Sequence, residues 1–161
     1  MEKRTGSIID NPEVVESNKS AEYKEMCDGV PDAVFVLGAS AVKNPVTGEF
    51  QSSDYGDPDP HGLLGGGKGR SIAAAELAEY FPNTKFVASS TLPPRNGEEE
   101  QPLSEVTAKE LSHYGVDSEN IVLYPESYST LTELMGLIKL SVQNHWQHSV
   151  VLTNETQVER S

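Results

Sequence analysis

The sequence predicts an α/β domain of the Rossmann-like, doubly wound type, with a mostly parallel sheet and helices on both faces. Three observations predict this fold class. Four short apolar runs have the length of buried strands. Segments with helical patterning separate them, and such alternation favours parallel strands joined by right-handed crossovers. Finally, a chain of 161 residues is typical of one domain whose core needs no disulfide.

The N-terminal part of the chain differs in composition from the rest. Residues 1–29 are polar and charged, with weak helical periodicity around residues 21–26. We therefore expect a polar extension that is either a mobile lead-in or one peripheral helix, followed by the α/β domain over residues 30–161. Residues 33–37 are a continuous apolar run closed by glycine, which predicts a strand buried on both faces.

A long polar segment follows the first strand. Residues 42–69 are rich in Gly, Pro and Asp, and long loops of this kind are often functional. Residues 70–81 then predict a helix that Pro82 ends, and its candidate core positions are Ile72, Ala75, Leu77 and Ala78 or Phe81.

The second half of the chain repeats the alternation of strand and helix. The helix that begins near residue 129 has Ser129 or Thr130 as a candidate N-cap, and Glu133 is suitably placed for a capping box. The predicted elements are a strand in 84–90, a helix over 103–115 capped by Gly115, a strand in 119–127, a helix over 129–146 and a strand in 149–154.

Composition excludes some classes of function. The formal net charge is -13, and an acidic surface disfavours binding to nucleic acid or anionic membranes. The single cysteine, Cys27, has no disulfide partner in the chain, which fits a reducing compartment. The sequence contains neither an apolar run of membrane-spanning length nor the apolar core of a secretory signal, so the expected location is cytoplasmic.

The carboxyl ends of the predicted strands form the expected ligand site. Open α/β sheets bind ligands there, and the four strands end in residues 38–40, 89–91, 126–130 and 153–155. In the order of a simple Rossmann half, the last of these segments would lie beside Gly38. Small polar loops and helix N-termini suit anions, so we expect a small anionic ligand. The candidate ligand-binding residues are Gly38, Ala39, Ser40, Arg70, Ser89, Ser127, Thr130, Glu133, Thr153, Asn154 and Arg160.

Two residues are candidates for catalysis. Arg70 opens a helix after a glycine run, where it could clamp a phosphate or carboxylate with help from Lys68, or remain a loop arginine. Glu105 is a candidate general base, although a first-turn glutamate is also favoured by the helix dipole. Capping alone would also account for Ser129, Thr130 and Glu133. The run of glycines around Lys68 lacks the spacing of a Walker A loop, which argues against an NTPase.

A metal site is a minor alternative. Asp54, Asp57, Asp59 and His61 are close in sequence, but their spacing is not that of an EF-hand loop. The prolines among them favour an extended, solvated loop. We therefore predict no metal ligands.

Several segments, taken in order, resemble the YdcF/SanA/ElyC-like family of bacterial α/β domains. The matching segments are DAVFVLGAS, GRSIAAAEL, KFVASST, LSEVTAKELSHYG, ESYSTLTEL and VVLTNETQVERS. The third lacks the usual glycines. In the last, Thr153 and Arg160 match the family, whereas Asn154 replaces Ser and Gln157 replaces a His. Chemistry that needs an imidazole is therefore not expected here.

This resemblance implies a function only in outline. The family is associated with envelope and peptidoglycan-precursor metabolism, and one branch is reported to bind S-adenosylmethionine, the only cofactor it suggests. Family members usually continue beyond the final Arg with a helix and a strand, so the resemblance predicts a C-terminally truncated domain. Two hypotheses remain: a domain, with or without enzymatic activity, that binds a phosphorylated or nucleotide-like ligand, and a non-catalytic scaffold that self-associates or contacts other proteins.

Overall fold

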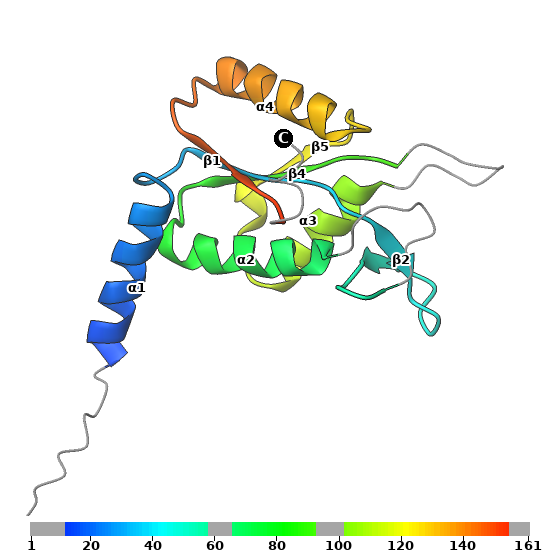
Figure 1. Ribbon diagram of the computed structural model, residues 1–161, viewed down its shortest axis with the longest axis horizontal. Coiled ribbons are helices and arrows are strands. Elements are labelled where there is room, and N and C mark those ends of the chain that lie inside the picture. Colours follow the sequence, from blue (N-terminus) through cyan, green and yellow to red (C-terminus); the bar gives the residue numbers. More distant parts are fainter. Residues whose placement is uncertain (1–11, 58–65, 93–101, 155–161) are drawn as a thin grey trace, which may run out of the picture.

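The fold is built around a four-stranded parallel sheet (Figure 1). The computed structural model describes residues 12–57, 66–92 and 102–154. The strands are β1 (Ala33–Val36), β4 (Lys85–Ser89), β5 (Ile121–Tyr124) and β6 (Ser149–Leu152), in the spatial order β5-β4-β1-β6. The predicted Rossmann-like α/β class is confirmed, and the first and last strands are neighbours, as a Rossmann half requires.

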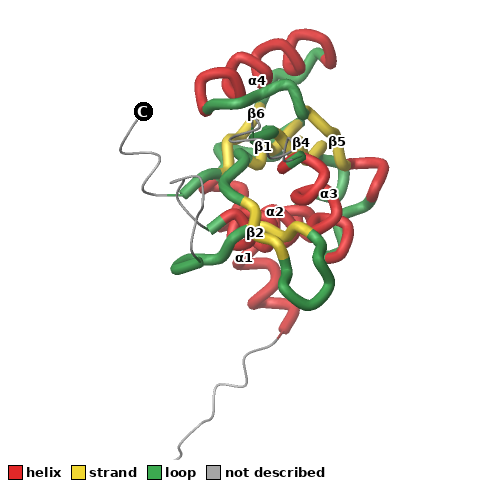
Figure 2. The backbone as a smooth tube through the Cα atoms, turned by 90° about the vertical axis from the view of Figure 1, so that its right-hand side faces the viewer, coloured by secondary structure: helices red, strands yellow, loops and turns green. Residues whose placement is uncertain are grey.

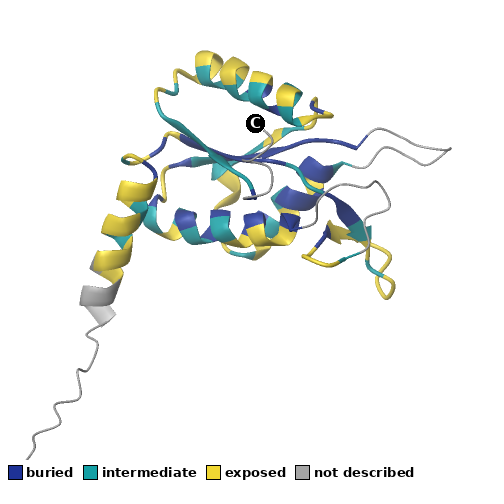
Figure 3. Ribbon diagram, viewed as in Figure 1, coloured by how far each residue is buried: buried dark blue, intermediate teal, exposed yellow. Residues whose placement is uncertain are grey.

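The central strand pairs on both sides and is buried on both faces. Val34 lies beside Phe86 of β4 and beside Val150 of β6. All four residues of β1 are buried, which explains why the run is continuously apolar rather than alternating. Figure 3 shows the buried residues concentrated in the strands and on the inner sides of the helices below them.

Two helices cover one face of the sheet and enclose the main core. These are α2 (Gly67–Tyr80) and α3 (Leu103–His113). The predicted core face of the first is only partly right, because Ile72 is 47% exposed. Arg70 and Ser71 are buried in its place, since both find polar partners inside the domain. The main cluster of buried residues is Cys27, Val34, Val36, Ala74, Ala75, Leu77, Phe81, Phe86, Ala88, Leu111 and Val116.

One helix, α4 (Thr130–Asn144), lies on the opposite face (Figures 1 and 2). Because β6 pairs with β1 on the side away from β4, a right-handed crossover from β5 must pass over this face. Gly136 lets the helix approach β5 closely, since a Cβ at this position would collide with the ring of Tyr124. The connection therefore places the first turn of α4 near the end of β1.

The segment predicted as one long loop contains an antiparallel hairpin. Its strands are β2 (Ala41–Lys43) and β3 (Phe50–Ser52), so the prediction of a loop over residues 42–69 is wrong in part. Asn44 closes the turn by accepting the backbone N–H of Val46 at 2.9 Å. The strands were too short for their alternation to be recognised, and the Ser52 N–H donates to the distant Glu110 at 2.7 Å, a contact that leaves no local pattern.

The remaining elements are peripheral. Residues of the polar extension form α1 (Pro12–Met26), which contacts α2 through the rings of Tyr23 and Tyr80, 5.0 Å apart. A short 3-10 helix, η1 (Ser118–Asn120), precedes β5. Across the described parts of the chain, no helix combines the length and apolar character needed to cross a membrane.

Candidate functional site

Gly38 follows β1 and is contacted by charged side chains from both faces of the sheet. Its N–H donates to Glu133 Oε1 of α4 at 2.7 Å, and its carbonyl accepts from Arg70 Nη1 of α2 at 2.8 Å. Gly38 lies where the strand order reverses, between the ends of β4 and β6. The structure therefore places a buried cation and a buried carboxylate at the position where open α/β sheets bind ligands.

Arg70 reaches this position from the first turn of α2 and is only 2% exposed. Its Nη1 also donates to the carbonyl of Leu37 at 2.6 Å, and its Nε donates to Asn154 Oδ1 at 3.0 Å. Its third nitrogen, Nη2, is buried and has no hydrogen-bond partner among the described residues. Burial lowers the pKa of Arg70, and the charge of Glu133 opposes this shift. Because the ordinary pKa of arginine is far above neutrality, the guanidinium remains charged.

Glu133 is buried to a similar degree, with 3% exposure. Its Oε1 accepts both the Gly38 N–H and the hydroxyl of Ser89, each at 2.7 Å. Burial raises the pKa of this carboxyl, while the bonds from Ser89 and Gly38 and the charge of Arg70 partly oppose the increase. A carboxyl with a raised pKa can exchange a proton nearer to neutral pH, as acid–base groups in active sites do.

The predicted capping role of Glu133 is wrong. Ser129 is the N-cap of α4, and its partner in the capping box is Thr132. The Ser129 N–H donates to Thr132 Oγ1 at 3.0 Å, and the Thr132 N–H donates to Ser129 Oγ at 3.3 Å. Glu133 is one residue further along the helix and points to the sheet. Thr130, also predicted to bind ligand, is the half-buried first residue of α4.

Two serines near the ends of β4 and β5 have fully buried hydroxyl groups. Ser104 and Ser127 are each 0% exposed, and in the part of the chain that the structure describes their Oγ atoms have no hydrogen-bond partner. Their backbones are fixed to the end of β4, because Ser104 N donates to Ser90 O and Thr91 N donates to Ser127 O, both at 2.8 Å. Ser127 was a predicted ligand-binding residue. Ser104 was not, since a serine in the first turn of a helix carries no signal of burial.

Two other predicted residues serve the hairpin instead. Ser40 Oγ lies 2.5 Å from Ser53 Oγ, and Ser53 N donates to Ser40 O at 2.9 Å. The Cβ of Ala39 lies against α2, since a Cβ built on Gly67 would be 3.2 Å from it. These contacts hold the hairpin against the end of β1, and they account for both residues without a ligand.

The N-terminus of α2 is occupied by the same hairpin. The carbonyl of Ser53 accepts from the N–H groups of Gly66 and Lys68, both at 3.2 Å. The Lys68 ammonium is exposed and lies 3.7 Å from Asp54 Oδ2. The expected assistance of Lys68 to Arg70 is therefore not seen, because these donors already have partners within the protein.

The structure separates the two predicted catalytic residues. Glu105 is exposed in the first turn of α3, whereas Arg70 is buried beside Gly38. Thr153 is half-buried and directly precedes Asn154, and Arg160 lies outside the described residues. The best-placed carboxylate is therefore Glu133. The sequence pointed to it only as a helix-terminal residue.

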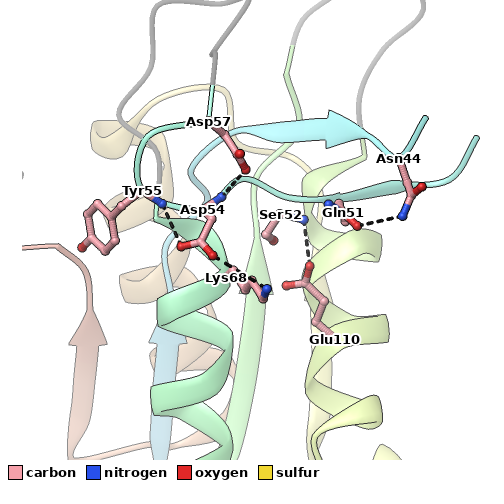
Figure 4. Close-up of polar contacts among 8 residues, drawn as sticks. All are labelled: Asn44, Gln51, Ser52, Asp54, Tyr55, Asp57, Lys68 and Glu110. Atoms are coloured by element: carbon pink, nitrogen blue, oxygen red, sulfur yellow. Dashed lines mark hydrogen bonds and ion pairs between the residues drawn. The ribbon is translucent and has the colours of Figure 1, made fainter. Parts of the chain in front are cut away.

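The alternative metal site has no support in the described residues. Asp57 Oδ2 accepts the N–H of Asp54 at 2.7 Å, and Asp54 Oδ1 accepts the N–H of Tyr55 at 2.8 Å (Figure 4). Asp59 and His61 lie outside the described residues. Within residues 12–57, 66–92 and 102–154, no group of three His, Cys, Asp or Glu side chains is placed to hold a metal ion.

Comparisons with known proteins found no relative of this chain. No family model, curated protein or solved structure matches the chain. The resemblance to the YdcF/SanA/ElyC-like family therefore stays a prediction, and the geometry around Gly38 is the basis for any assignment of function.

Proposed function

We propose that this domain binds a phosphorylated or nucleotide-like small molecule at the carboxyl ends of its parallel strands. The observation that carries the proposal is the buried guanidinium of Arg70, whose Nη2 has no acceptor within residues 12–57, 66–92 and 102–154. A buried charged donor without a partner costs stability, and an anionic oxygen would satisfy it. Arginine is also the side chain best suited to hold phosphate or carboxylate groups.

The groups around Arg70 support a polar ligand rather than an apolar one. Glu133, Ser89 and Asn154 are all buried and all come from the ends of strands or from the first turn of α4. Within the described residues, Arg70 and Glu133 form no direct ion pair, although each influences the electrostatics of the other. A ligand with one anionic group and one hydroxyl or amine would complement both.

A stronger version of this proposal is that the domain is an enzyme. Glu133 would be the group that transfers a proton, since burial raises its pKa and it lies next to Arg70 at Gly38. In this form Arg70 would hold the anionic part of the substrate. A role in bacterial envelope metabolism rests on the family resemblance alone.

A thermal-shift screen of the whole chain tests the proposal. The panel would contain pyrophosphate, ADP, UDP, sugar nucleotides, S-adenosylmethionine and polyprenyl-phosphate mimics. A ligand present at a hundred times its dissociation constant should stabilise the fold by about 2.7 kcal/mol. A cooperative melt with no shift for any anionic compound would contradict the proposal.

Two variants test whether the ligand binds at Arg70. Arg70→Lys keeps the charge but loses the planar fork, so the shift should shrink or vanish. Lys68→Ala is the matched control, because Lys68 is an exposed cation of the same helix that contacts only Asp54 among the described ion pairs. Since Arg70 also binds the backbone of Leu37, the unliganded melt of each variant must be recorded first. If Arg70→Lys shows the same ligand-induced shift as the wild type, the ligand binds at another site.

Self-association is a second candidate, favoured by an exposed apolar stripe on α4. The stripe consists of Leu131, Met135, Ile138 and Val142, which are 61–71% exposed. Their spacing of four, three and four residues is that of a coiled-coil seam. The two charged residues of α4 are Glu133, which is buried, and Lys139, which lies 3.3 Å from Glu126. A second copy is the favoured occupant, since two chains of charge -13 repel least along an uncharged face.

Sedimentation velocity over a range of protein concentration tests this second candidate. Ile138→Glu should convert a dimer to a monomer. Val46→Glu is the control, since Val46 is 91% exposed on the hairpin turn, away from the stripe. A wild-type chain that stays monomeric at high concentration would contradict self-association through α4.

A further inference from the structure

Tyr55 lies next to the Arg70 site although it is an exposed residue of the hairpin segment. Its side chain is 69% exposed, so it contributes little to the core. A Cβ built on Gly66 would lie 2.8 Å from Tyr55 Cζ and 2.9 Å from Asn154 Nδ2. The ring and the side-chain amide of Asn154 are therefore neighbours. The oxygen of that amide accepts a hydrogen bond from Arg70 Nε.

The backbone is shaped to leave room for this ring. Gly66 has a φ of +93°, and any side chain there would collide with the ring. Gly69, one turn along α2, also faces the ring, since a Cβ there would lie 3.9 Å from Tyr55 Cε2. The hydroxyl end of the ring therefore lies beside the start of α2, and most of the side chain is open to solvent.

Several bonds fix the turn that carries Tyr55 (Figure 4). The Tyr55 N–H donates to Asp54 Oδ1, and Asp54 is in turn held by Asp57 and by Lys68 of α2. The preceding strand is anchored to α3, because the Ser52 N–H donates to Glu110 Oε1 at 2.7 Å. In Figure 4 the Tyr55 ring points away from this cluster of contacts. The backbone that carries the exposed ring is therefore anchored to α2 and α3.

We propose that the Tyr55 ring is a stacking platform for the planar base of a nucleotide whose phosphates are held by Arg70. This inference rests on the proposed anion site and narrows its ligand to nucleotides. An exposed aromatic ring beside a buried guanidinium offers the two features that a nucleotide needs, a π-face for the base and a cation for the phosphate. Such stacking tolerates different bases, since every base has a π-face.

Isothermal titration with three probes tests the inference. Pyrophosphate carries the anion alone, whereas ADP and UDP add a base. Tyr55→Ala should weaken the binding of ADP and UDP by about 5- to 150-fold and leave pyrophosphate unchanged. Tyr55→Phe keeps the ring and should bind all three like the wild type. Phe50→Ala is the matched control, because it removes the ring of Phe50, which packs near Lys43 on the same hairpin.

The outcomes separate this inference from the proposed function. If Tyr55→Ala binds the nucleotides and pyrophosphate as the wild type does, Tyr55 is not a stacking platform. The proposed anion site at Arg70 would be unaffected by that result. Equal losses for pyrophosphate and ADP would overturn the stacking platform too, since the ring would then act on the anion or on the fold. Failure of all three probes to bind the wild type would refute this inference, and the proposed function would fall with it if no other compound of the thermal-shift panel binds.

Discussion

Glu133 Oε1 accepts the N–H of Gly38 at 2.7 Å, joining residues that are 95 positions apart in the sequence. The carbonyl of the same glycine accepts from Arg70, so α2 and α4 are connected through one residue at the end of β1. The contacts that would present charges to a ligand therefore also hold the two faces of the domain together. Substitutions at this point must be assessed for stability and for binding separately.

Glu133→Gln should change how stability depends on pH. Because burial raises the folded-state pKa of Glu133, the folded protein binds a proton more tightly than the unfolded chain. Its contribution is complete below the unfolded pKa of about 4.3 and is lost as the pH rises through the folded pKa. Urea titrations from pH 4.5 to 7.5 should show wild-type stability falling relative to Glu133→Gln.

Asp32→Asn is the control for that experiment. The backbone N–H groups of His148 and Gln147 donate to Asp32 and lower its pKa. Its contribution is therefore present above the unfolded pKa of about 3.9 and is lost only as the pH falls through the folded value. The difference between wild type and Asp32→Asn should be constant over the same range. A constant difference for Glu133→Gln as well would show that Glu133 titrates normally.

Anion binding should be coupled to proton uptake at Glu133. A negative charge placed near Arg70 would raise the pKa of this buried carboxyl further. Titration of pyrophosphate at pH 7 in buffers of different ionisation enthalpy measures the protons taken up. The wild type should take up more protons than Glu133→Gln, in which the titrating group is absent. Equal uptake by the two proteins would separate Glu133 from the ligand.

The sequence predicted the sheet better than it predicted the site. Four apolar runs and their order were enough to place β1, β4, β5 and β6, because burial on both faces leaves a clear pattern. Arg70, Gly38 and Asn154 were also predicted as site residues from the rule that strand ends bind ligands, and the structure brings the three together. That rule identifies positions on a sheet and not the partner of each side chain.

The errors have a common physical cause. Glu133 was assigned to a capping box from local context, but its partner is Gly38, 95 positions away. The hairpin was missed because its strands have only three residues each. The position of Tyr55 beside the site could not be predicted either. Only the folded structure brings Gly66 and Asn154 next to this exposed aromatic ring of a polar segment. Long-range polar contacts leave no periodic pattern in the sequence.

Removal of the hydroxyl of Ser104 or of Ser127 should stabilise the unliganded domain. Ser127→Ala and Ser104→Ala each delete a fully buried Oγ that has no partner among the described residues, which should increase the free energy of unfolding by about 1 kcal/mol. Ser71→Ala is the opposite control, since the Ser71 hydroxyl is fully buried but donates to Glu110 Oε2 at 2.7 Å. Urea denaturation measures all three variants.

The same variants bear on the ligand site. If Ser127 contacts a bound anion, Ser127→Ala should gain stability and lose affinity for pyrophosphate, a combination that a purely structural serine would not show. Loss of stability in both Ser104→Ala and Ser127→Ala would mean that the two hydroxyls are hydrogen-bonded in solution, for example to internal water.

Gly38 and Ser90 should be energetically coupled. A Cβ at position 38 would collide with the Cβ of Ser90, so Gly38→Ala should cost about 1–3 kcal/mol. Ser90 has a φ of +86°, in the region that favours glycine, so Ser90→Gly relieves backbone strain and offsets the loss of the 3.3 Å bond from Ser90 Oγ to the Ser127 carbonyl. Ser90→Gly also removes the atoms that an alanine at position 38 would meet first.

A double-mutant cycle measures this coupling. The double variant should be more stable than the sum of the single effects by about 0.5–3 kcal/mol, since the collision is absent from its structure. Ser90→Ala is the matched control, because it retains the Cβ and should not rescue Gly38→Ala. Additive effects would mean that the ends of β1 and β4 move apart easily, and the geometry that brings Arg70 and Glu133 to Gly38 would then not be rigid.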